Sequence, residues 1–298
     1  MTTHVVDPDR VPDAPLVPPG DNGGLHNVFR QRYLLKLLVR KELKARYQGS
    51  VLGMLWSYIQ PMVRFLAYFL VIGYVFNMTR GMTNFPIHIF TGIVMVHYFT
   101  ETFSSGTRSI VKNKALVNKM SLPREMFPVA AMLVSAYNTL PQMAILLVSV
   151  LFFDWSPTPL DFAAGVLGFS IIAVFGMALA LVFSAARVFF KDFQNIVATF
   201  TIFVTWSVPM IYPYDRIPNL FHGSWAEQVY LANPIANGVI LFQQLFWVPT
   251  VGPDAEYPAV MPDYLFTRGL IVLAVCLLLL ALAQWIFTRL EGKFAERL

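Results

Sequence analysis

The sequence predicts an all-α, polytopic membrane protein with six transmembrane helices, and three observations lead to this fold class. Of the 298 residues, 56% are hydrophobic and only 13% are charged, whereas a soluble protein carries about 25% charged residues. Several uncharged apolar runs are long enough to cross about 30 Å of hydrocarbon, which takes about 20 helical residues. The lysine and arginine residues cluster in alternate connecting segments, which fits an even number of spans.

Residues 1–25 are polar, rich in proline and glycine, and without an apolar segment that would act as a signal peptide. We expect them to form a flexible cytoplasmic tail. Residues 26–48 follow, and their basic residues recur every four positions: Arg32, Lys36, Arg40 and Lys44. This spacing stacks the charges along one helix face, with leucines roughly opposite. A helix of this kind lies in the membrane interface, either as an anchor on anionic lipid, which the spacing alone favours, or as a docking surface for a partner.

Residues 51–290 hold the predicted transmembrane domain. The six spans are 51–76, 85–103, 127–153, 162–183, 193–212 and 269–288. The single cysteine, Cys276, lies inside the sixth span, so no disulfide forms within the chain.

Most of the 22 lysine and arginine residues precede the first span, follow the second or fourth span, or lie in the C-terminal residues 291–298. Only Arg80, Arg216 and Arg268 fall in the other connections, and Arg64 falls inside a span. Positive charge marks the cytoplasmic side. We therefore expect both termini in the cytoplasm and the chain in the inner (plasma) membrane. The same distribution explains the net charge of +5 without nucleic acid as a partner.

The connection between spans five and six, residues 214–264, is mostly acidic yet contains an apolar stretch at 229–248. Asn233-Pro234 and Gly238 interrupt this stretch. Two short re-entrant helices on the outer side fit this pattern, because broken helices are tolerated where protein or water satisfies the backbone. An ordinary folded external loop is the alternative.

A polar stripe runs along the first span at four-residue steps: Trp56, Gln60, Arg64 and Tyr68. An arginine inside a membrane faces protein or water rather than lipid, so this stripe points inward. The second span has a similar stripe that includes His97 and Glu101, which allows an Arg64–Glu101 ion pair. His97 and Glu101 also have metal-ligand spacing, but without further ligands nearby we expect no metal site.

The fifth span carries aromatic residues on one broad face: Phe200, Phe203 and, at its edge, Trp206. Such stripes form packing surfaces or interface belts, and a carbohydrate path would need the same flat faces, so the residues leave the choice open. In the fourth span Gly176, Ala180 and Ser184 form a ladder of small residues, which lets two helices approach closely.

Several catalytic motifs are absent from the sequence. There is no G-x-x-x-x-G-K-[ST] loop to cradle phosphates, no G-x-S-x-G and no H-E-x-x-H. The chain is therefore predicted not to be an enzyme and to bind no cofactor of its own.

Four sequence patches carry a family resemblance. They are RKELKARY at 40–47 with SVLGMLWSYIQP at 50–61, LPREMFP at 122–128, PMIYP at 209–213 with a later Asn233-Pro234, and EGKFAE at 291–296. Their order and spacing, from about residue 28 to the end, resemble the permease subunits of type-2 ABC exporters for O-antigen, teichoic acid and related cell-envelope polysaccharides. The sequence is most similar to the mycobacterial branch that exports cell-wall galactan. It departs from the common pattern at Met126 and at residues 187–192.

The resemblance implies a permease that moves a lipid-linked polysaccharide outward as a homodimer, with two copies of a separate P-loop ATP-binding subunit that holds ATP and Mg. Spans one and five would line the pore through Trp56, Gln60, Arg64, Tyr68, Phe200, Phe203 and Trp206. The interface helix and a coupling segment at 107–124 would contact the ATP-binding subunit through Arg40, Lys44, Lys112, Lys119, Arg124 and Glu125.

Two other functions remain open from the sequence. One is a type-2 permease for a small lipid or drug. The other is a lipid-dependent membrane glycosyltransferase, which needs an acidic pair or a base at the membrane surface, and only His97 with Glu101 comes close.

Overall fold

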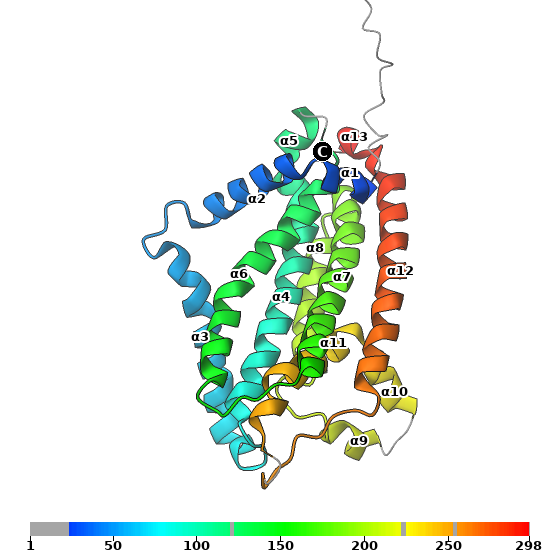
Figure 1. The fold of residues 1–298 in the computed structure, drawn as a ribbon. Coiled ribbons are helices and arrows are strands. Elements are labelled where there is room, and N and C mark those ends of the chain that lie inside the picture. The colour runs from blue at the N-terminus through cyan, green and yellow to red at the C-terminus, as the bar shows by residue number, and fades with distance from the viewer. Residues whose placement is uncertain (1–23, 120–121, 222–224, 253–254, 298) are drawn as a thin grey trace, which may run out of the picture.

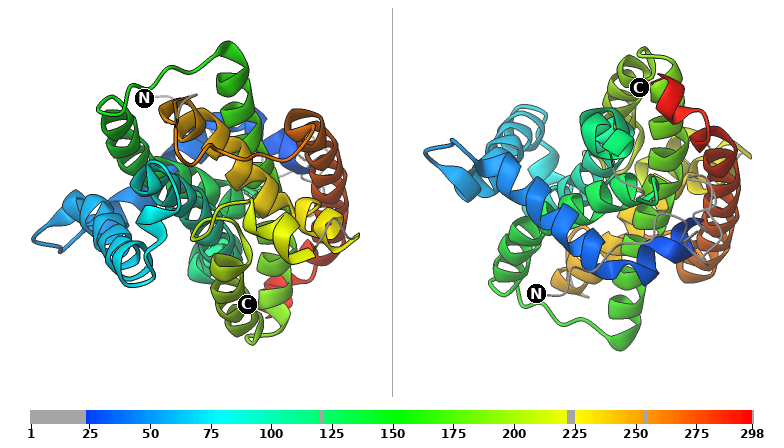
Figure 2. Two further views of the ribbon diagram at one scale, coloured as in Figure 1. Left: turned by 90° about the horizontal axis from the view of Figure 1, so that it is seen from below. Right: turned by 90° about the horizontal axis from the view of Figure 1, so that it is seen from above.

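The computed structural model describes residues 24–119, 122–221, 225–252 and 255–297, and every regular element within these ranges is a helix. The all-α prediction is confirmed. Nearly all of the predicted tail, 1–23, lies outside the described residues. The long helices stand side by side in one bundle (Figure 1), and the end-on views show them grouped around a common centre (Figure 2).

The bundle is built from six main helices. They are α3 (Trp56–Tyr68), which continues as the π-helical η2 (Phe69–Val75), α4 (Phe85–Lys112), α6 (Met126–Val150), α7 (Pro159–Phe189), α8 (Phe193–Ser207) and α12 (Leu265–Glu291). Within the described ranges, four segments are long and apolar enough to cross a membrane: Trp56–Val75, Met126–Val150, Pro159–Phe189 and Leu265–Glu291. The chain is therefore a polytopic membrane protein. The predicted second and fifth spans correspond to α4 and α8.

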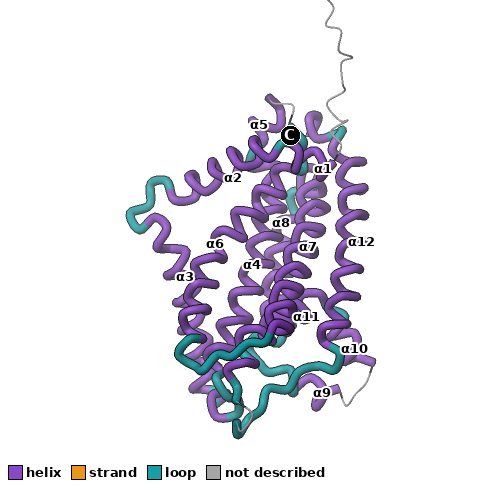
Figure 3. Tube along the Cα trace, in the orientation of Figure 1, coloured by secondary structure: helices purple, strands orange, loops and turns teal. Residues whose placement is uncertain are grey.

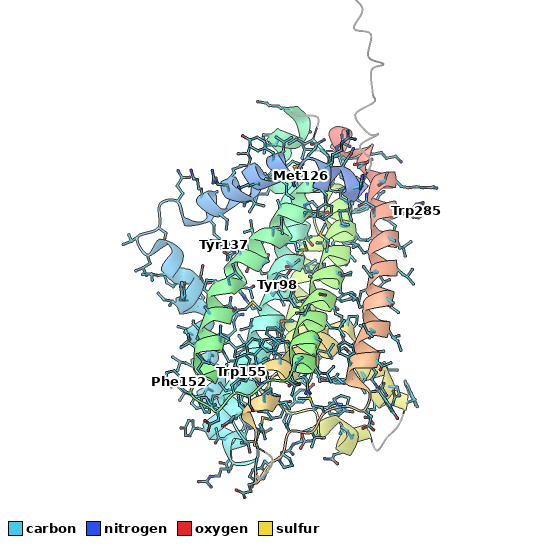
Figure 4. All side chains as sticks on the ribbon, in the orientation of Figure 1. Tyr98, Met126, Tyr137, Phe152, Trp155 and Trp285 are labelled. Atoms are coloured by element: carbon cyan, nitrogen blue, oxygen red, sulfur yellow. The ribbon has the colours of Figure 1, made fainter. Side chains whose placement is uncertain are left out.

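Helix α4 occupies the centre of the bundle, where it contacts α3, α6, α7, α8 and α11 (Pro234–Phe246). At about 1.5 Å per residue it is about 42 Å long, and it extends nine residues beyond the predicted end of the second span. Tyr98 of α4 is fully enclosed, whereas Trp285 points outward from α12 (Figure 4). Because its neighbours shield it, α4 carries polar residues that an outer helix would have to expose to lipid.

Helix α7 packs against α4 and α11 through positions where a side chain would not fit. At Gly106 of α4, a Cβ would lie 2.5 Å from that of Ala180. At Gly168 of α7, a Cβ would lie 2.6 Å from the carbonyl oxygen of Gly238 in α11. The predicted packing role of the Gly176–Ala180–Ser184 ladder is thereby confirmed, because Gly176 also lies against Thr102 of α4.

The start of α7 is fixed by a capping box between Thr158 and Asp161. The hydroxyl of Thr158 accepts from the backbone N–H of Asp161, and the Asp161 carboxylate accepts from the backbone N–H of Thr158. This pattern satisfies donors that a helix N-terminus otherwise leaves open. Asp161 also accepts a 2.8 Å hydrogen bond from Gln244, which links this end of α7 to α11.

The prediction that the fifth span is helical to residue 212 is wrong, because α8 ends at Ser207. Val208 is extended, at φ −109° and ψ 153°, as expected for a residue that precedes a proline. Pro209 has no N–H to continue the helix, and its carbonyl oxygen accepts a 2.8 Å hydrogen bond from Gln243 of α11.

The segment between α8 and α12 forms short helices: α9 (Arg216–Phe221), α10 (Trp225–Leu231), α11 and the 3₁₀ turn η4 (Val248–Thr250). Asn233 caps α11 by accepting from the backbone N–H of Ile235 at 3.0 Å. Helix α11 is buried against α4, α7 and α12. Figure 3 shows the loops of this segment at the lower end of the bundle. Because α11 lies inside the bundle, this segment is not an ordinary external loop. That its short helices re-enter the membrane stays a prediction.

Four short elements gather at the other end of the bundle, which we call the basic end: α1 (Gly24–Arg30), α2 (Arg32–Tyr47), α5 (Lys114–Lys119) and α13 (Phe294–Arg297) (Figure 1). The predicted single helix at 26–48 is two helices that meet at Gln31. Leu35 and Leu38 of α2 are buried, and α2 contacts α6. The predicted basic stripe is exposed at all its positions: Arg32, Lys36, Arg40 and Lys44.

Candidate functional site

A polar cavity of about 750 Å³ lies beneath α2. Side chains from α2, α3, α4, α6 and α8 line it. Hydroxyl groups contribute much of its wall on α4, at Thr100, Ser104 and Ser105. These lining residues place the cavity between α2 and the bundle, and the loop that joins α2 to α3 stands away from α6 on the same side of the molecule (Figure 1).

Two smaller cavities share residues with this one. A cavity of about 250 Å³ shares Arg46 and is also lined by Trp56 and Gln60. A cavity of about 300 Å³ shares Arg64 and is also lined by Tyr68. All four residues of the predicted polar stripe of the first span thus border one series of polar spaces along α3. Their role as a substrate path stays a prediction.

The face that α8 presents to these cavities differs from the predicted aromatic face. Thr201 and Thr205 line the smaller cavity that contains Tyr68. Phe200 instead packs edge-on against Phe103 of α4, at 6.0 Å between ring centroids, and Phe203 and Trp206 are exposed on the outer surface of the chain. The four-residue spacing of the two threonines was the available signal in the sequence.

The predicted Arg64–Glu101 ion pair is wrong, because Glu101 pairs with Arg46 at the end of α2. Glu101 also accepts a 3.0 Å hydrogen bond from Asn138 of α6. One turn away on α4, His97 shares a 3.0 Å hydrogen bond with Gln142, again on α6. These contacts link α2, α4 and α6 through polar side chains.

A second ion pair joins α2 to α4, between Glu42 and Lys112. Asn113 donates a 3.2 Å hydrogen bond to the same carboxylate and accepts one of 2.7 Å from Lys41. Burial raises the pKa of Glu42, but the hydrogen bonds from Lys112 and Asn113 outweigh burial and hold this pKa below its ordinary value. Lys112, predicted to contact a partner, is exposed and bonded to α2.

The predicted coupling segment contains α5, whose Lys119 is exposed, while residues 120–121 lie outside the described residues. Arg124 and Glu125, which were predicted to contact a partner, are buried within the chain, so they do not form an open docking surface. Arg124 donates to the backbone carbonyl of Glu291 and lies 5.7 Å from the ring centroid of Phe294. Glu125 accepts a 2.8 Å hydrogen bond from Gln284 of α12. The two residues therefore join the start of α6 to the C-terminal elements.

Comparison with known proteins supplies a family. The family description "ABC-2 type transporter" matches residues 33–247. The chain is 29% identical over 275 residues to the O-antigen export system permease protein RfbA of Myxococcus xanthus, a match that covers 91% of this chain and 98% of that protein. It is 26% identical to the protein of the same name in Klebsiella pneumoniae, over 88% of this chain and 94% of the relative. It is 21% identical to the polysialic acid transport protein KpsM of Escherichia coli, over 79% and 84% of the two chains.

Proposed function

Since this chain belongs to the ABC-2 type transporter family, we propose that it is the membrane permease of an exporter that moves a cell-surface polysaccharide. Similarity over nearly the full length of O-antigen export permeases supports this substrate class. The observation that carries the proposal furthest is the series of polar cavities along α3, which share Arg46 and Arg64. A hydrated glycan chain needs hydroxyl and amide groups along its route, and an apolar cargo does not.

The energy for export comes from a separate subunit in this proposal. The sequence has no phosphate-cradling G-x-x-x-x-G-K-[ST] loop, so ATP and Mg bind to a partner P-loop subunit, present in two copies. The exposed basic residues of α2, together with Lys119 of α5, offer this partner a surface at the basic end. The buried Arg124 and Glu125 support that surface from within.

The permease acts as a homodimer in this proposal. Only 11% of the most apolar stretch of α3 and η2 is buried within one copy, and Arg64 is exposed on this helix. A charged residue of this kind is costly against lipid. A second copy that covers α3 and α8 would enclose the polar cavities between the two protomers and give the glycan a path shielded from the membrane.

Topology and cargo complete the proposal. Helices α4 and α8 complete six spans with the four apolar candidates, and the basic end faces the cytoplasm, with both termini there, because positive charge is retained on that side of a plasma membrane. The cargo is a lipid-linked polysaccharide, with mycobacterial-type cell-wall galactan as the candidate suggested by sequence resemblance.

The test is ATP-dependent transport into inside-out vesicles. The chain is co-expressed with the P-loop subunit from the same organism. The vesicles are then given lipid-linked galactan that carries a radiolabelled sugar. Protection of the label from an added glycosidase, only when ATP is present, supports the proposal. A partner subunit with its P-loop lysine replaced is the matched control. Transport of a small lipid or drug but no glycan would favour the small-substrate permease, and sugar transfer by the purified chain without ATP would favour a glycosyltransferase.

A further inference from the structure

The cavity beneath α2 contains more positive than negative charge. Its ionisable residues are Glu42, Arg46, Arg64, His97, Glu101, Arg108 and Lys112. Three arginines and a lysine, all charged at neutral pH, thus face two carboxylates. Each of the two smaller cavities contains a single arginine, Arg46 or Arg64, which it shares with this cavity.

The two carboxylates of the cavity are already paired. Glu42 binds Lys112, and Glu101 binds Arg46. Arg64 and Arg108, by contrast, have no hydrogen bond or acidic partner among the residues that the structure describes. A guanidinium group presents a planar fork of donors that matches the oxygens of a phosphate. Both side chains are exposed, so the cavity holds two arginines whose donors are open to a ligand from outside the chain.

Neighbouring groups and location narrow the ligand class. The hydroxyl of Ser104 lies in the same wall as the arginines and can donate to a further phosphate oxygen. The neighbouring hydroxyls of Thr100 and Ser105 already donate to backbone carbonyls of α4. The roof of the cavity is α2, whose exposed basic face is typical of a helix at the membrane interface. A phosphate group carried by a lipid would arrive at this level, with its hydrocarbon chain remaining in the membrane.

We propose that this cavity binds the phosphate ester of a lipid-borne cargo, and that Glu101 holds Arg46 in place of that phosphate when the cavity is empty. The inference rests on the proposed function, since it concerns the lipid end of the exported glycan. Arriving phosphate oxygens take the donors of Arg46, Arg64 and Arg108. Glu101 then keeps the hydrogen bond from Asn138, so its carboxylate is not left without a partner.

Binding is measured by isothermal titration calorimetry on the full-length chain, purified in mild detergent without an ATP-binding subunit. The probes are farnesyl phosphate, farnesol and inorganic phosphate. We expect farnesyl phosphate to bind at least tenfold more tightly than either other probe, because only it has both the anion and the lipid chain. Farnesol binding as tightly as farnesyl phosphate would overturn the anion site, and inorganic phosphate binding as tightly would overturn the lipid-borne source.

The arginines are tested singly by R64A and R108A. Each should weaken farnesyl phosphate binding about tenfold, the loss expected for one hydrogen bond between charged groups. The matched control is R80A, which removes an exposed cation outside the cavity and should leave the affinity unchanged. Equal thermal unfolding midpoints would show that the variants are folded, and unchanged affinity in both R64A and R108A would refute the site.

The role of Glu101 is tested by a double-mutant cycle. E101Q should strengthen farnesyl phosphate binding several-fold, because it frees Arg46. In an R46A background the same change should have no effect, since there is no arginine to free. An equal gain in both backgrounds would mean that Glu101 acts only as a nearby negative charge, which contradicts its direct competition for Arg46.

The vesicle transport assay separates this inference from the proposed function. A chain that transports glycan with ATP but does not bind farnesyl phosphate would refute the phosphate site alone. A chain that binds farnesyl phosphate through Arg64 and Arg108 but transports no glycan with its ATP-binding partner would refute the proposed function alone.

Discussion

Arg46 at the end of α2 is paired with Glu101 of α4, 55 residues further along the chain. Glu42 of α2 is paired in the same way with Lys112, at the end of α4. Two ion pairs therefore fasten the interface helix to the central helix of the bundle. Because α4 contacts most of the other long helices, a displacement of α2 acts on the interior of the bundle directly and does not have to pass through the loop before α3.

The Glu42–Lys112 pair should make stability depend on pH. The pKa of Glu42 is lowered in the folded chain from its ordinary value of 4.5. Its contribution is therefore fully present above pH 4.5 and is lost as the pH falls through the lowered pKa. We expect E42Q to lower the free energy of unfolding at pH 7 by less than about 1 kcal/mol, since Lys112 is exposed, and to have no effect near pH 2.

This prediction is checked by thermal unfolding in detergent at both pH values. Asp154, which is exposed at a positive φ of 51°, supplies a matched control as D154N, because asparagine tolerates that backbone conformation. D154N should match the wild type at both values of pH. A deficit of E42Q that persists unchanged near pH 2 would contradict the ionic origin of the effect.

The contact of α7 with α11 at Gly168 should not tolerate a methyl group. In G168A the new Cβ would lie 2.6 Å from the carbonyl oxygen of Gly238, so the two helices have to separate. Overpacking of this kind costs about 1–3 kcal/mol, which a lower thermal unfolding midpoint would report. The control is G292A, because Gly292 has a helical backbone and nothing within 4 Å of its Cβ position. Equal loss in both variants would mean that the α7–α11 contact is not tight.

The fold followed from the sequence where each helix carries its own signal. Apolar length located α3, α6, α7 and α12, and the small-residue ladder located the face of α7 that packs on α4. The end of α8 was placed five residues too late, since hydropathy continues through Val208–Tyr212 although Pro209 stops the helix. Apolar content predicts which residues can lie in lipid, but it does not predict where a helix ends. That end depends on the backbone restriction that a single proline imposes on the residue before it.

The partners of the charged side chains did not follow from the sequence. The similar polar stripes of the first two spans suggested Arg64 as the partner of Glu101, but α2 packs over this part of the bundle and Arg46 forms the pair. The family resemblance assigned Arg124 to the contact with an ATP-binding subunit, whereas the C-terminal elements cover it. Both errors concern contacts between segments far apart in the chain, for which periodicity within one segment holds no information. The residues of the stripe from Trp56 to Tyr68 do border one series of cavities, which a pattern within one helix can predict, and their role as a substrate path stays a prediction.

Cysteine labelling should distinguish the two faces of α8. The single native cysteine, Cys276, is buried, so introduced thiols can be read against a low background. In membranes that contain the assembled exporter, T201C and T205C should react with a charged, water-soluble maleimide, because both positions line the polar cavity beside Tyr68. L278C, on the exposed outer face of α12, should remain unlabelled in lipid. Labelling of F203C without labelling of T205C would instead assign the path to the aromatic face.

Substitutions of Lys119 and Arg124 should have different effects, although both are basic residues near the same short segment. The first should weaken binding of the ATP-binding subunit, and the second should lower the stability of the permease. Lys119 is exposed on α5, so K119E should release the ATP-binding subunit in a pull-down while leaving the thermal unfolding midpoint of the permease unchanged. Arg124 is buried beneath the C-terminal elements, where it donates to the carbonyl of Glu291. R124A should therefore lower the free energy of unfolding by about 1–3 kcal/mol, the cost of leaving a buried hydrogen-bond acceptor without its donor. A stable R124A that loses the ATP-binding subunit would show instead that Arg124 reaches the partner and that the C-terminal cover opens in the complex.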